Sequence, residues 1–232
     1  MRVAAVLVAA GRGERFGHEL PKAFVSLAGR PLVLRAAEAL FAAPEVTCIV
    51  PVVPGDGLER FRALVAEFGE SPCLAAPVAG GAERQDSVAA GLEALPADFD
   101  LVAVHDAARP LVRPEAVSRV VAAAARAGAA ILATPVGDTL KRVADGRIVE
   151  TPERSAFWAA QTPQVFRVEL LREALAKAQA AGLRATDDAA LVERLGAAVH
   201  VVEGDSDNLK LTHAEDLAVA ERILARREET GA

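Results

Sequence analysis

Runs of consecutive apolar residues recur along the chain and mark its predicted strands. Val3–Ala10 contains only aliphatic residues and leads directly into glycines. A run of this kind is typical of a central strand in a parallel sheet that is covered on both faces. Further strands are predicted from largely apolar runs at Val46–Val53, Cys73–Val78, Leu101–Val104, Ala129–Pro135 and Ala198–Val202.

Between these runs, apolar residues repeat at helical spacing. The predicted helices are Pro31–Phe41, Leu58–Phe68, Glu83–Leu95, Pro114–Ala127, Val168–Ala181, Asp187–Arg194 and a last helix that ends near Arg227. Thr212 and Glu215 have the spacing of a capping box for this last helix. Strands that alternate with helices predict an α/β fold, with a Rossmann-like, mostly parallel sheet flanked by helices. We expect residues 1–232 to form one domain.

The pattern changes at about residues 136–156, where apolar and charged residues alternate. Leu140–Val143 and Arg147–Val149 flank an Asp-Gly dipeptide, which predicts a β-hairpin. Such a hairpin would protrude from the α/β core as an arm. Two interpretations stay open from this pattern alone: a surface flap, or an arm that pairs with a second subunit.

Composition excludes several classes of protein. A net charge of −6 argues against a general nucleic-acid-binding protein, so a polyanionic ligand would need a local basic cluster. No apolar run approaches the ~20 residues of a membrane span, and we expect no membrane partner. The start of the chain lacks a signal-peptide pattern, and Cys48 and Cys73 are too few for a disulfide framework. We therefore expect a cytoplasmic protein.

The segment after the first strand has the composition of a phosphate-binding loop. Gly11 and Gly13 allow a ligand to approach the backbone, while Arg15 and Lys22 supply positive charge. The spacing fits neither a Walker loop, because no Gly-Lys-Ser/Thr follows, nor a dinucleotide-binding turn, because Pro21 would interrupt the helix. We interpret the segment as a lid over a triphosphate, against the alternative of a plain strand-to-helix turn.

Two more clusters follow predicted strands. In the first, Gly80 and Gly81 would expose N–H groups, and Asp86 and Ser87 could bind a base or ribose or merely cap a helix. In the second, Asp106 ends the strand at Val104 and is a candidate ligand for Mg²⁺ or another divalent cation. Its alternative role is a simple ion pair with Arg109.

Polar residues also cluster around the hairpin and before the last helix. They include Asp138-Thr139-Leu-Lys141, Thr151-Pro-Glu-Arg154, Gln161-Thr162-Pro163-Gln164 and Asp205-Ser-Asp207-Asn208-Leu-Lys210-Leu-Thr212. Lys210 could face Lys22 across a phosphate, or could be an ordinary solvated lysine. Together with the earlier clusters, these motifs resemble those of the 2-C-methyl-D-erythritol 4-phosphate cytidylyltransferase family, over essentially the whole chain. Ala23 and Asp188 depart from the commoner Gln and Glu of that pattern.

The resemblance implies a reaction between CTP and 2-C-methyl-D-erythritol 4-phosphate, by in-line attack on the CTP α-phosphate with release of pyrophosphate. It implies catalytic roles for Arg15, Lys22 and Lys210, and a metal-binding role for Asp106. The implied nucleotide-binding residues are Ala9, Ala10, Gly11, Gly13, Gly81, Asp86, Ser87 and Ala107. The implied residues for the second substrate are Arg109, Thr139, Arg154, Thr162 and Thr186.

The resemblance also implies a homodimer in which the arm embraces the second subunit and Arg154 serves the neighbour's site. The nearest alternative is a cytidylyltransferase for another sugar-alcohol phosphate, such as ribitol 5-phosphate. A regulatory nucleotide-binding protein without catalysis is disfavoured, because Arg15, Lys22, Asp106 and Lys210 are all present.

Overall fold

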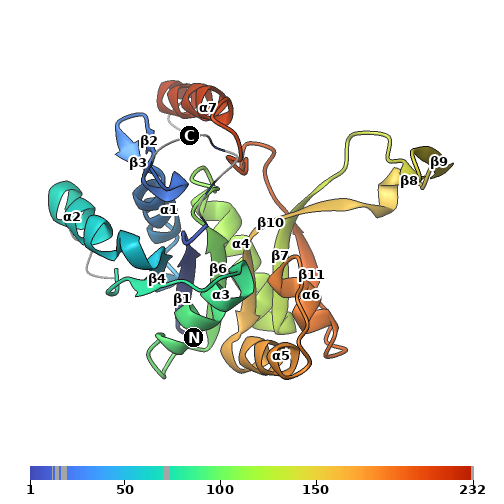
Figure 1. The fold of residues 1–232 in the computed structure, drawn as a ribbon, viewed down its shortest axis with the longest axis horizontal. Helices are drawn as coiled ribbons and strands as arrows, with labels where there is room; N and C mark the ends of the chain where they lie inside the picture. The colour runs from blue at the N-terminus through green and yellow to red at the C-terminus, as the bar shows by residue number, and fades with distance from the viewer. Residues whose placement is uncertain (12, 14–15, 17–19, 70–73, 231–232) are drawn as a thin grey trace.

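A seven-stranded sheet forms the centre of the computed structural model, which describes residues 1–11, 13, 16, 20–69 and 74–230 (Figure 1). Its strand order is β11-β7-β10-β6-β1-β4-β5, and every neighbouring pair is parallel except the two pairs that involve β10. The strands are β1 Val3–Val8, β4 Val46–Val53, β5 Val78–Ala79, β6 Leu101–Asp106, β7 Ala129–Pro135, β10 Trp158–Arg167 and β11 His200–Glu203. This confirms the predicted Rossmann-like α/β fold.

Strand β1 lies in the interior of the sheet, as its aliphatic sequence predicts. It pairs with β6 on one side and with β4 on the other, and five of its six residues are fully buried. The carboxyl ends of β1 and β6 lie next to each other, with Val8 opposite Asp106. Parallel pairing thus brings the loop after Val8 beside the end of β6.

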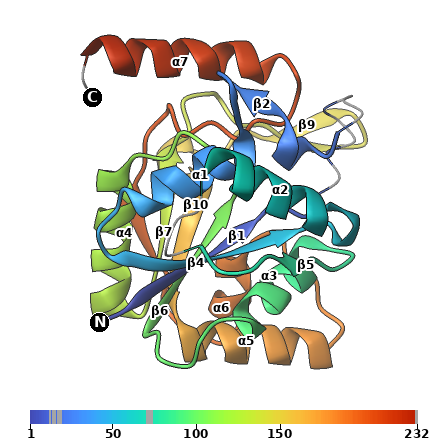
Figure 2. The same ribbon diagram turned by 90° about the vertical axis from the view of Figure 1, so that its left-hand side faces the viewer.

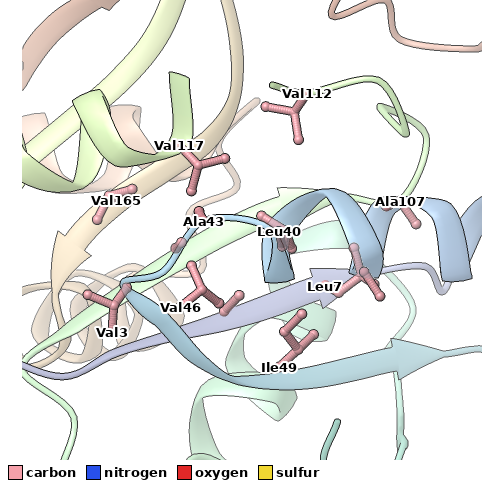
Figure 3. Close-up of a cluster of buried hydrophobic side chains, with 14 of the residues drawn as sticks. Val3, Leu7, Leu40, Ala43, Val46, Ile49, Ala107, Val112, Val117 and Val165 are labelled. Atoms are coloured by element: carbon pink, nitrogen blue, oxygen red, sulfur yellow. The ribbon is translucent and has the colours of Figure 1, made fainter. Parts of the chain in front are cut away.

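Helices cover both faces of the sheet (Figure 2). On one face lie α1 Leu32–Phe41, α2 Leu58–Phe68 and α4 Pro114–Ala127, whose apolar side chains pack with Val3, Leu7 and Ile49 (Figure 3). On the other face lie α3 Arg84–Glu93, α5 Val168–Ala180 and α6 Asp188–Glu193. Short 3₁₀ turns occupy Lys22–Phe24, Gly55–Gly57 and Arg154–Ala156.

Helix α7, Asp216–Thr230, packs outside these two layers (Figure 2). Its residues Ala220 and Ile223 join a small cluster with Leu27 and Leu111, next to the short hairpin of β2 Ser26–Leu27 and β3 Arg30–Pro31. The predicted capping box before this helix is wrong. The Asp216 carboxylate accepts the backbone N–H groups of Thr212 and His213 instead, and the helix continues to Thr230.

The apolar pattern does not predict β10, which pairs antiparallel with both of its neighbours, β6 and β7. Its residues 161–164 read Gln-Thr-Pro-Gln, which looks like a polar loop, and its pairing with β7 shifts register between Ala160 and Gln164. These polar residues are nevertheless buried. Smaller differences are that α1 begins at Leu32 after Pro31, that β6 continues to Asp106, and that β11 begins at His200.

The predicted hairpin is present and extends away from the sheet (Figure 1). Strands β8 Arg142–Ala144 and β9 Arg147–Glu150 pair antiparallel, and Asp145 and Gly146 both have positive φ at the turn. Asp-Gly suits such a turn because both central residues must adopt this conformation. The apolar side chains of Val143, Ile148 and Val149 are exposed.

Candidate active site

A cleft of about 560 Å³ opens where β1 and β6 end. This main cleft is lined by Val8, Ala9, Ala10, Gly11, Lys22, Ala23, Leu32, Gly81, Ala82, Glu83, Arg84, Ser87, Asp106, Ala107, Ala108 and Lys210. Open α/β sheets bind ligands at this edge, beyond the carboxyl ends of the strands. The sequence motifs that follow β1, β5, β6 and β11 therefore meet in one place.

Most of the predicted nucleotide-binding and catalytic residues lie in the main cleft. They are Ala9, Ala10, Gly11, Lys22, Gly81, Ser87, Ala107 and Lys210, and the predicted metal ligand Asp106 lies there with them. Gly13 is not among the residues that line the cleft; its φ is +66°, and a Cβ added there would come 2.6 Å from Lys22 Cβ. This contact explains a glycine at that position. Arg15 and Cys73 lie outside the described residues.

Lys22 and Lys210 both present positive charge to the main cleft. Lys22 Nζ donates a hydrogen bond to the backbone carbonyl of Leu211 at 2.6 Å, which ties the loop after β1 to the segment that carries Lys210. Lys210 Nζ lies 2.8 Å from Asp106 Oδ2. The two lysines thus approach the cleft from segments far apart in the sequence, as the phosphate interpretation requires.

Asp106 is held by two cations. Its Oδ1 accepts from Arg84 Nε at 3.0 Å, and its Oδ2 accepts from Lys210. Burial by itself would raise the pKa of this carboxyl, but the charges of Arg84 and Lys210 outweigh burial and hold the pKa well below its usual range. Asp106 is therefore ionised at neutral pH.

The alternative prediction, that Asp106 pairs with Arg109, is wrong. The carboxylate of Asp106 is bound by Arg84 and Lys210 instead. Arg109 donates to the backbone carbonyls of Asn208 at 2.7 Å and of Ala160 at 3.2 Å. It thereby joins β10 to the loop before α7. Sequence proximity suggested Arg109 as the partner, whereas the fold brings Arg84 to Asp106 from a different element.

A magnesium ion fits this site if nucleotide phosphates supply most of its ligands. Mg²⁺ is commonly held by one or two carboxylates together with substrate phosphates and water, and Asp106 offers one ionised carboxylate on the cleft wall. Within the described ranges, no group of three or more His, Cys, Asp or Glu side chains could hold a metal ion. The described side chains thus fit a nucleotide-bound metal, not a closed protein site.

His105 and Thr162 support the end of β6 from behind. The Thr162 hydroxyl accepts the Asp106 backbone N–H at 3.1 Å and lies 3.0 Å from His105 Nδ1. His105 Nε2 lies 3.0 Å from the carbonyl of Arg109, so this nitrogen carries the proton and Nδ1 accepts from Thr162. Burial lowers the pKa of His105 to about 4, which makes the ring neutral.

A smaller cavity of about 220 Å³ adjoins the main cleft. This side cavity is lined by Arg84, Asp106, Arg109, Ala160, Gln161, Thr162, Gln164, Thr186, Asp187 and Lys210. It contains three of the residues predicted for the second substrate, namely Arg109, Thr162 and Thr186. Because Arg84, Asp106 and Lys210 line both spaces, the predicted nucleotide and acceptor residues meet at these three side chains.

The structure places Asp86 away from the main cleft. Its carboxylate accepts the backbone N–H of Glu83 in a capping box at the start of α3 and forms an ion pair with Arg184. The N–H groups of the glycine pair are also used internally: Gly80 donates to Val53 O, and Gly81 donates to Ser87 Oγ. Of the glycine pair, only Gly81 lines the cleft.

Thr139 and Arg154 belong to the arm and line neither space within their own chain. Both side chains are exposed, and Arg154 donates to the backbone carbonyl of Gly137 at 2.6 Å. The structure therefore does not bring these two residues together with Arg109, Thr162 and Thr186. Within the single chain, these two predicted substrate-binding residues thus lie apart from the side cavity.

Sequence reasoning missed the roles of Arg84 and Asp188. Arg84 belongs to the Gly-Gly-x-x-Arg-x-Asp-Ser motif and Asp188 to Thr-Asp-Asp, so both were visible as polar residues. Their wide separation in the sequence concealed their ion pair, in which Arg84 Nη1 lies 2.9 Å from Asp188 Oδ2. The pair becomes visible only in the folded chain, where the Arg84 side chain at the start of α3 reaches Asp188 of α6 and Asp106 of β6.

Comparison with known proteins identifies the family of this chain. The profile of the IspD family, 2-C-methyl-D-erythritol 4-phosphate cytidylyltransferase, matches residues 3–226. The chain belongs to this family. Among the cytidylyltransferases of that name, the protein from Geobacillus kaustophilus is 46% identical over 228 residues, covering 98% of this chain and 99% of the relative. The protein from Pelotomaculum thermopropionicum is also 46% identical, covering 98% and 96%.

A solved cytidylyltransferase structure has the same fold. The 2-C-methyl-D-erythritol 4-phosphate cytidylyltransferase from Thermus thermophilus superposes with a TM-score of 0.75 at 39% identity, covering 96% of this chain and 98% of that one. The chain is thus a nucleotidyltransferase by family, and its candidate active site is the main cleft, where the strand-end motifs meet.

Proposed function

We propose that this cytidylyltransferase joins CTP and 2-C-methyl-D-erythritol 4-phosphate, giving 4-diphosphocytidyl-2-C-methyl-D-erythritol and pyrophosphate. The observation that carries the proposal is the meeting of Lys22, Lys210 and Asp106 in one cleft, in a chain of this family. Two anionic substrates need cations between them, and a chain of net charge −6 supplies those cations locally.

In this proposal the phosphate oxygen of the acceptor attacks the α-phosphorus of CTP, and the bond to pyrophosphate breaks. The protein forms no covalent bond. It aligns the two substrates and neutralises the negative charge that builds on the α-phosphate. Lys22 and Lys210, which line the main cleft, would neutralise this charge. The role of Arg15 remains a prediction from the sequence.

The nucleotide would occupy the main cleft, and the acceptor would occupy the side cavity near Arg109 and Thr186. A magnesium ion, when bound with CTP, would neutralise phosphate charge, with Asp106 as its protein ligand. The base and ribose would contact the backbone of residues 9–11 and the region of Gly81 and Ser87. Asp86 would act there only through the capping of α3.

The acceptor distinguishes this proposal from its nearest alternative, a cytidylyltransferase for ribitol 5-phosphate. The names of the relatives favour methylerythritol phosphate. Pyrophosphate release should be measured with CTP and each sugar-alcohol phosphate in turn, and then with UTP and ATP. We expect turnover with CTP and methylerythritol phosphate only. Comparable turnover with ribitol 5-phosphate or with ATP would contradict the proposal.

The charges of Lys22 and Lys210 should matter most in the transition state. Each change to alanine should lower kcat by about 10²–10³-fold, a typical loss for one group that stabilises developing charge. Binding of CTP alone, measured by calorimetry, should weaken much less. If either variant raises the Kd for CTP without lowering kcat, that lysine binds only the ground state.

We also propose a homodimer through the arm and a cytoplasmic location. The exposed apolar side chains of the arm support the first, and highly charged phosphate substrates, which do not cross bilayers unaided, support the second. Across the described part of the chain, no helix is long and apolar enough to span a membrane.

A further inference from the structure

Arg84 stands at the junction of the main cleft and the side cavity, both of which it lines. It comes from the first turn of α3 and reaches two carboxylates. Its Nε lies 3.0 Å from Asp106 Oδ1, and its Nη1 lies 2.9 Å from Asp188 Oδ2. One guanidinium thus donates a hydrogen bond to Asp106 and lies within ion-pair distance of Asp188.

The two cations that hold Asp106 differ in how firmly they are held. The Lys210 side chain is 46% exposed and extends from a loop, whereas the Arg84 side chain is 27% exposed and has a second anchor. That anchor, Asp188, is 1% exposed. Lys210 is therefore the freer of the two to turn to a phosphate, while Arg84 keeps a second carboxylate partner beside Asp106.

Asp188 is itself fixed by buried hydrogen bonds. Gln164 Oε1 accepts the backbone N–H groups of Asp188 at 3.1 Å and of Ala189 at 3.0 Å. Gln164 Nε2 donates to Asp187 Oδ2 at 2.9 Å, and the other oxygen of Asp187 caps α6. A chain of contacts thus runs from β10 through the start of α6 and Arg84 to Asp106.

We propose that Arg84 is a positioning residue for the transfer reaction: it holds Asp106 in place at the junction of the two spaces, and Asp188 orients Arg84. This inference rests on the proposed function. When Lys210 leaves Asp106 for a substrate phosphate, Arg84 remains the partner of the carboxylate. Without Arg84, two buried carboxylates would lose their shared cation, and Asp106 would move from the place where both substrates meet.

The test compares two arginines that pair with carboxylates near the start of α3. Arg84→Gln removes the proposed positioning residue. Arg184→Gln removes an arginine that pairs with Asp86 on α3 but lines neither the main cleft nor the side cavity. For each variant, kcat is measured by pyrophosphate release, the Kd for CTP by calorimetry without acceptor, and the Tm by calorimetric scanning.

Arg84→Gln should lower kcat by about 10²-fold, because misplacing a group by about 1 Å can cost that much. Its Kd for CTP should stay within about threefold of wild type, since the residue acts on alignment and not on ground-state binding. Arg184→Gln should keep both constants close to wild type. If Arg84→Gln leaves kcat unchanged, or weakens CTP binding as much as it lowers kcat/KM, the inference is wrong.

Asp188→Asn tests the second half of the proposal. It should lower kcat in the wild-type background but cause no further loss in an Arg84→Gln chain, because Asp188 acts through Arg84. If the losses in kcat of the two single variants instead add up in the double variant, Asp188 does not act through Arg84. If Arg84→Gln does not fold, Arg84→Lys and Asp188→Asn undergo the same comparison of kcat with Kd. A wild-type chain that releases no pyrophosphate, yet binds CTP, would contradict the proposed function, and not the geometry of Arg84.

Discussion

At the scale of single residues, His105 connects the end of β6 to its surroundings without reaching either the main cleft or the side cavity. Its ring is fully buried between the Arg109 carbonyl and the Thr162 hydroxyl. Thr162 in turn holds the backbone N–H of Asp106. Neutral His105 therefore supports the residue at the junction of the two spaces. Protonating it would break the contact between Nδ1 and the hydroxyl hydrogen.

The lowered pKa of His105 predicts that acid destabilises the fold. The unfolded chain takes up a proton near pH 6.5, whereas the folded chain does so only near pH 4. The folded state thus binds fewer protons in this window, and its free energy of unfolding should fall as the pH falls from 6.5 towards 4. The full loss is roughly 3 kcal/mol for this one group.

Denaturant unfolding at several pH values checks this prediction. His105→Gln should remove most of the pH dependence between pH 6.5 and pH 4.5, even if it lowers stability at pH 7. His200, an exposed residue of β11, offers the matched control, and His200→Gln should keep the wild-type dependence. Parallel pH curves for wild type and His105→Gln would show that His105 is not the group responsible.

At the scale of elements, helix α3 must lie close to the sheet, because Arg84 in its first turn contacts Asp106 at the end of β6. Gly91 permits this approach. A Cβ at this position would overlap Val6 and come 2.8 Å from Val52 Cγ2, and both partners are stiff β-branched residues in central strands. The close contact explains a glycine inside a helix, where alanine is otherwise preferred by about 1 kcal/mol.

Gly91→Ala should destabilise the protein despite this helix preference. Overpacking a core typically costs about 1–3 kcal/mol, which exceeds the gain in propensity. We expect the Tm to fall by about 2–4 °C for each kcal/mol lost in a chain of this size. Gly55→Ala is the control, because its Cβ would meet Ala79 Cβ at an ordinary 3.9 Å. A higher Tm for Gly91→Ala would mean that Val6 and Val52 move enough to accommodate the added methyl group.

The elements that the sequence predicts well are those with local signals at both ends. Helix α4 begins at Pro114 and is closed by Gly128 in a left-handed conformation, as predicted, because proline at the first turn and glycine after the last turn act locally. Strand β10 has no such signal. Its buried Gln161, Thr162 and Gln164 are satisfied by partners distant in the chain, so their burial follows only from the assembled fold.

The same distinction applies to the candidate site. Residues at or after strand ends, such as Asp106 and Lys22, could be predicted because the carboxyl ends of parallel strands lie at one edge of the sheet. The partner of Asp106 could not be predicted, because Arg84 reaches it from another element. Asp86 was predicted either to bind a base or ribose or to cap a helix, and the structure shows the cap: its carboxylate accepts the Glu83 N–H and pairs with Arg184.

At the scale of the whole molecule, the arm leaves apolar surface that its own chain does not cover. Val143, Ile148 and Val149 are exposed on the hairpin, as are Phe157 and Trp158 where the arm joins β10. An isolated two-stranded ribbon is marginal in water, and exposed apolar surface of this kind usually marks an interaction site. The twin arm of a second subunit would cover it through a two-fold contact.

Such a dimer would place Arg154 at the neighbour's substrate phosphate, where a guanidinium can bind in bidentate fashion. Complementation tests this arrangement. An Arg154→Ala chain mixed with a Lys22→Ala chain should form dimers with one intact site, because body and arm come from different chains. If subunits exchange at random, half of the dimers are mixed and activity should recover to about a quarter of wild type.

The matched control mixes a Lys22→Ala chain with a Lys210→Ala chain. Both lysines line the main cleft of a single chain, so no mixed dimer contains an intact site and activity should stay low. Recovery in the first mixture together with none in the second would establish sites shared between two chains. If exchange is proven by mass-labelled subunits and the first mixture also stays inactive, Arg154 either acts within its own chain or has no role in the reaction, and the sites are not shared between chains.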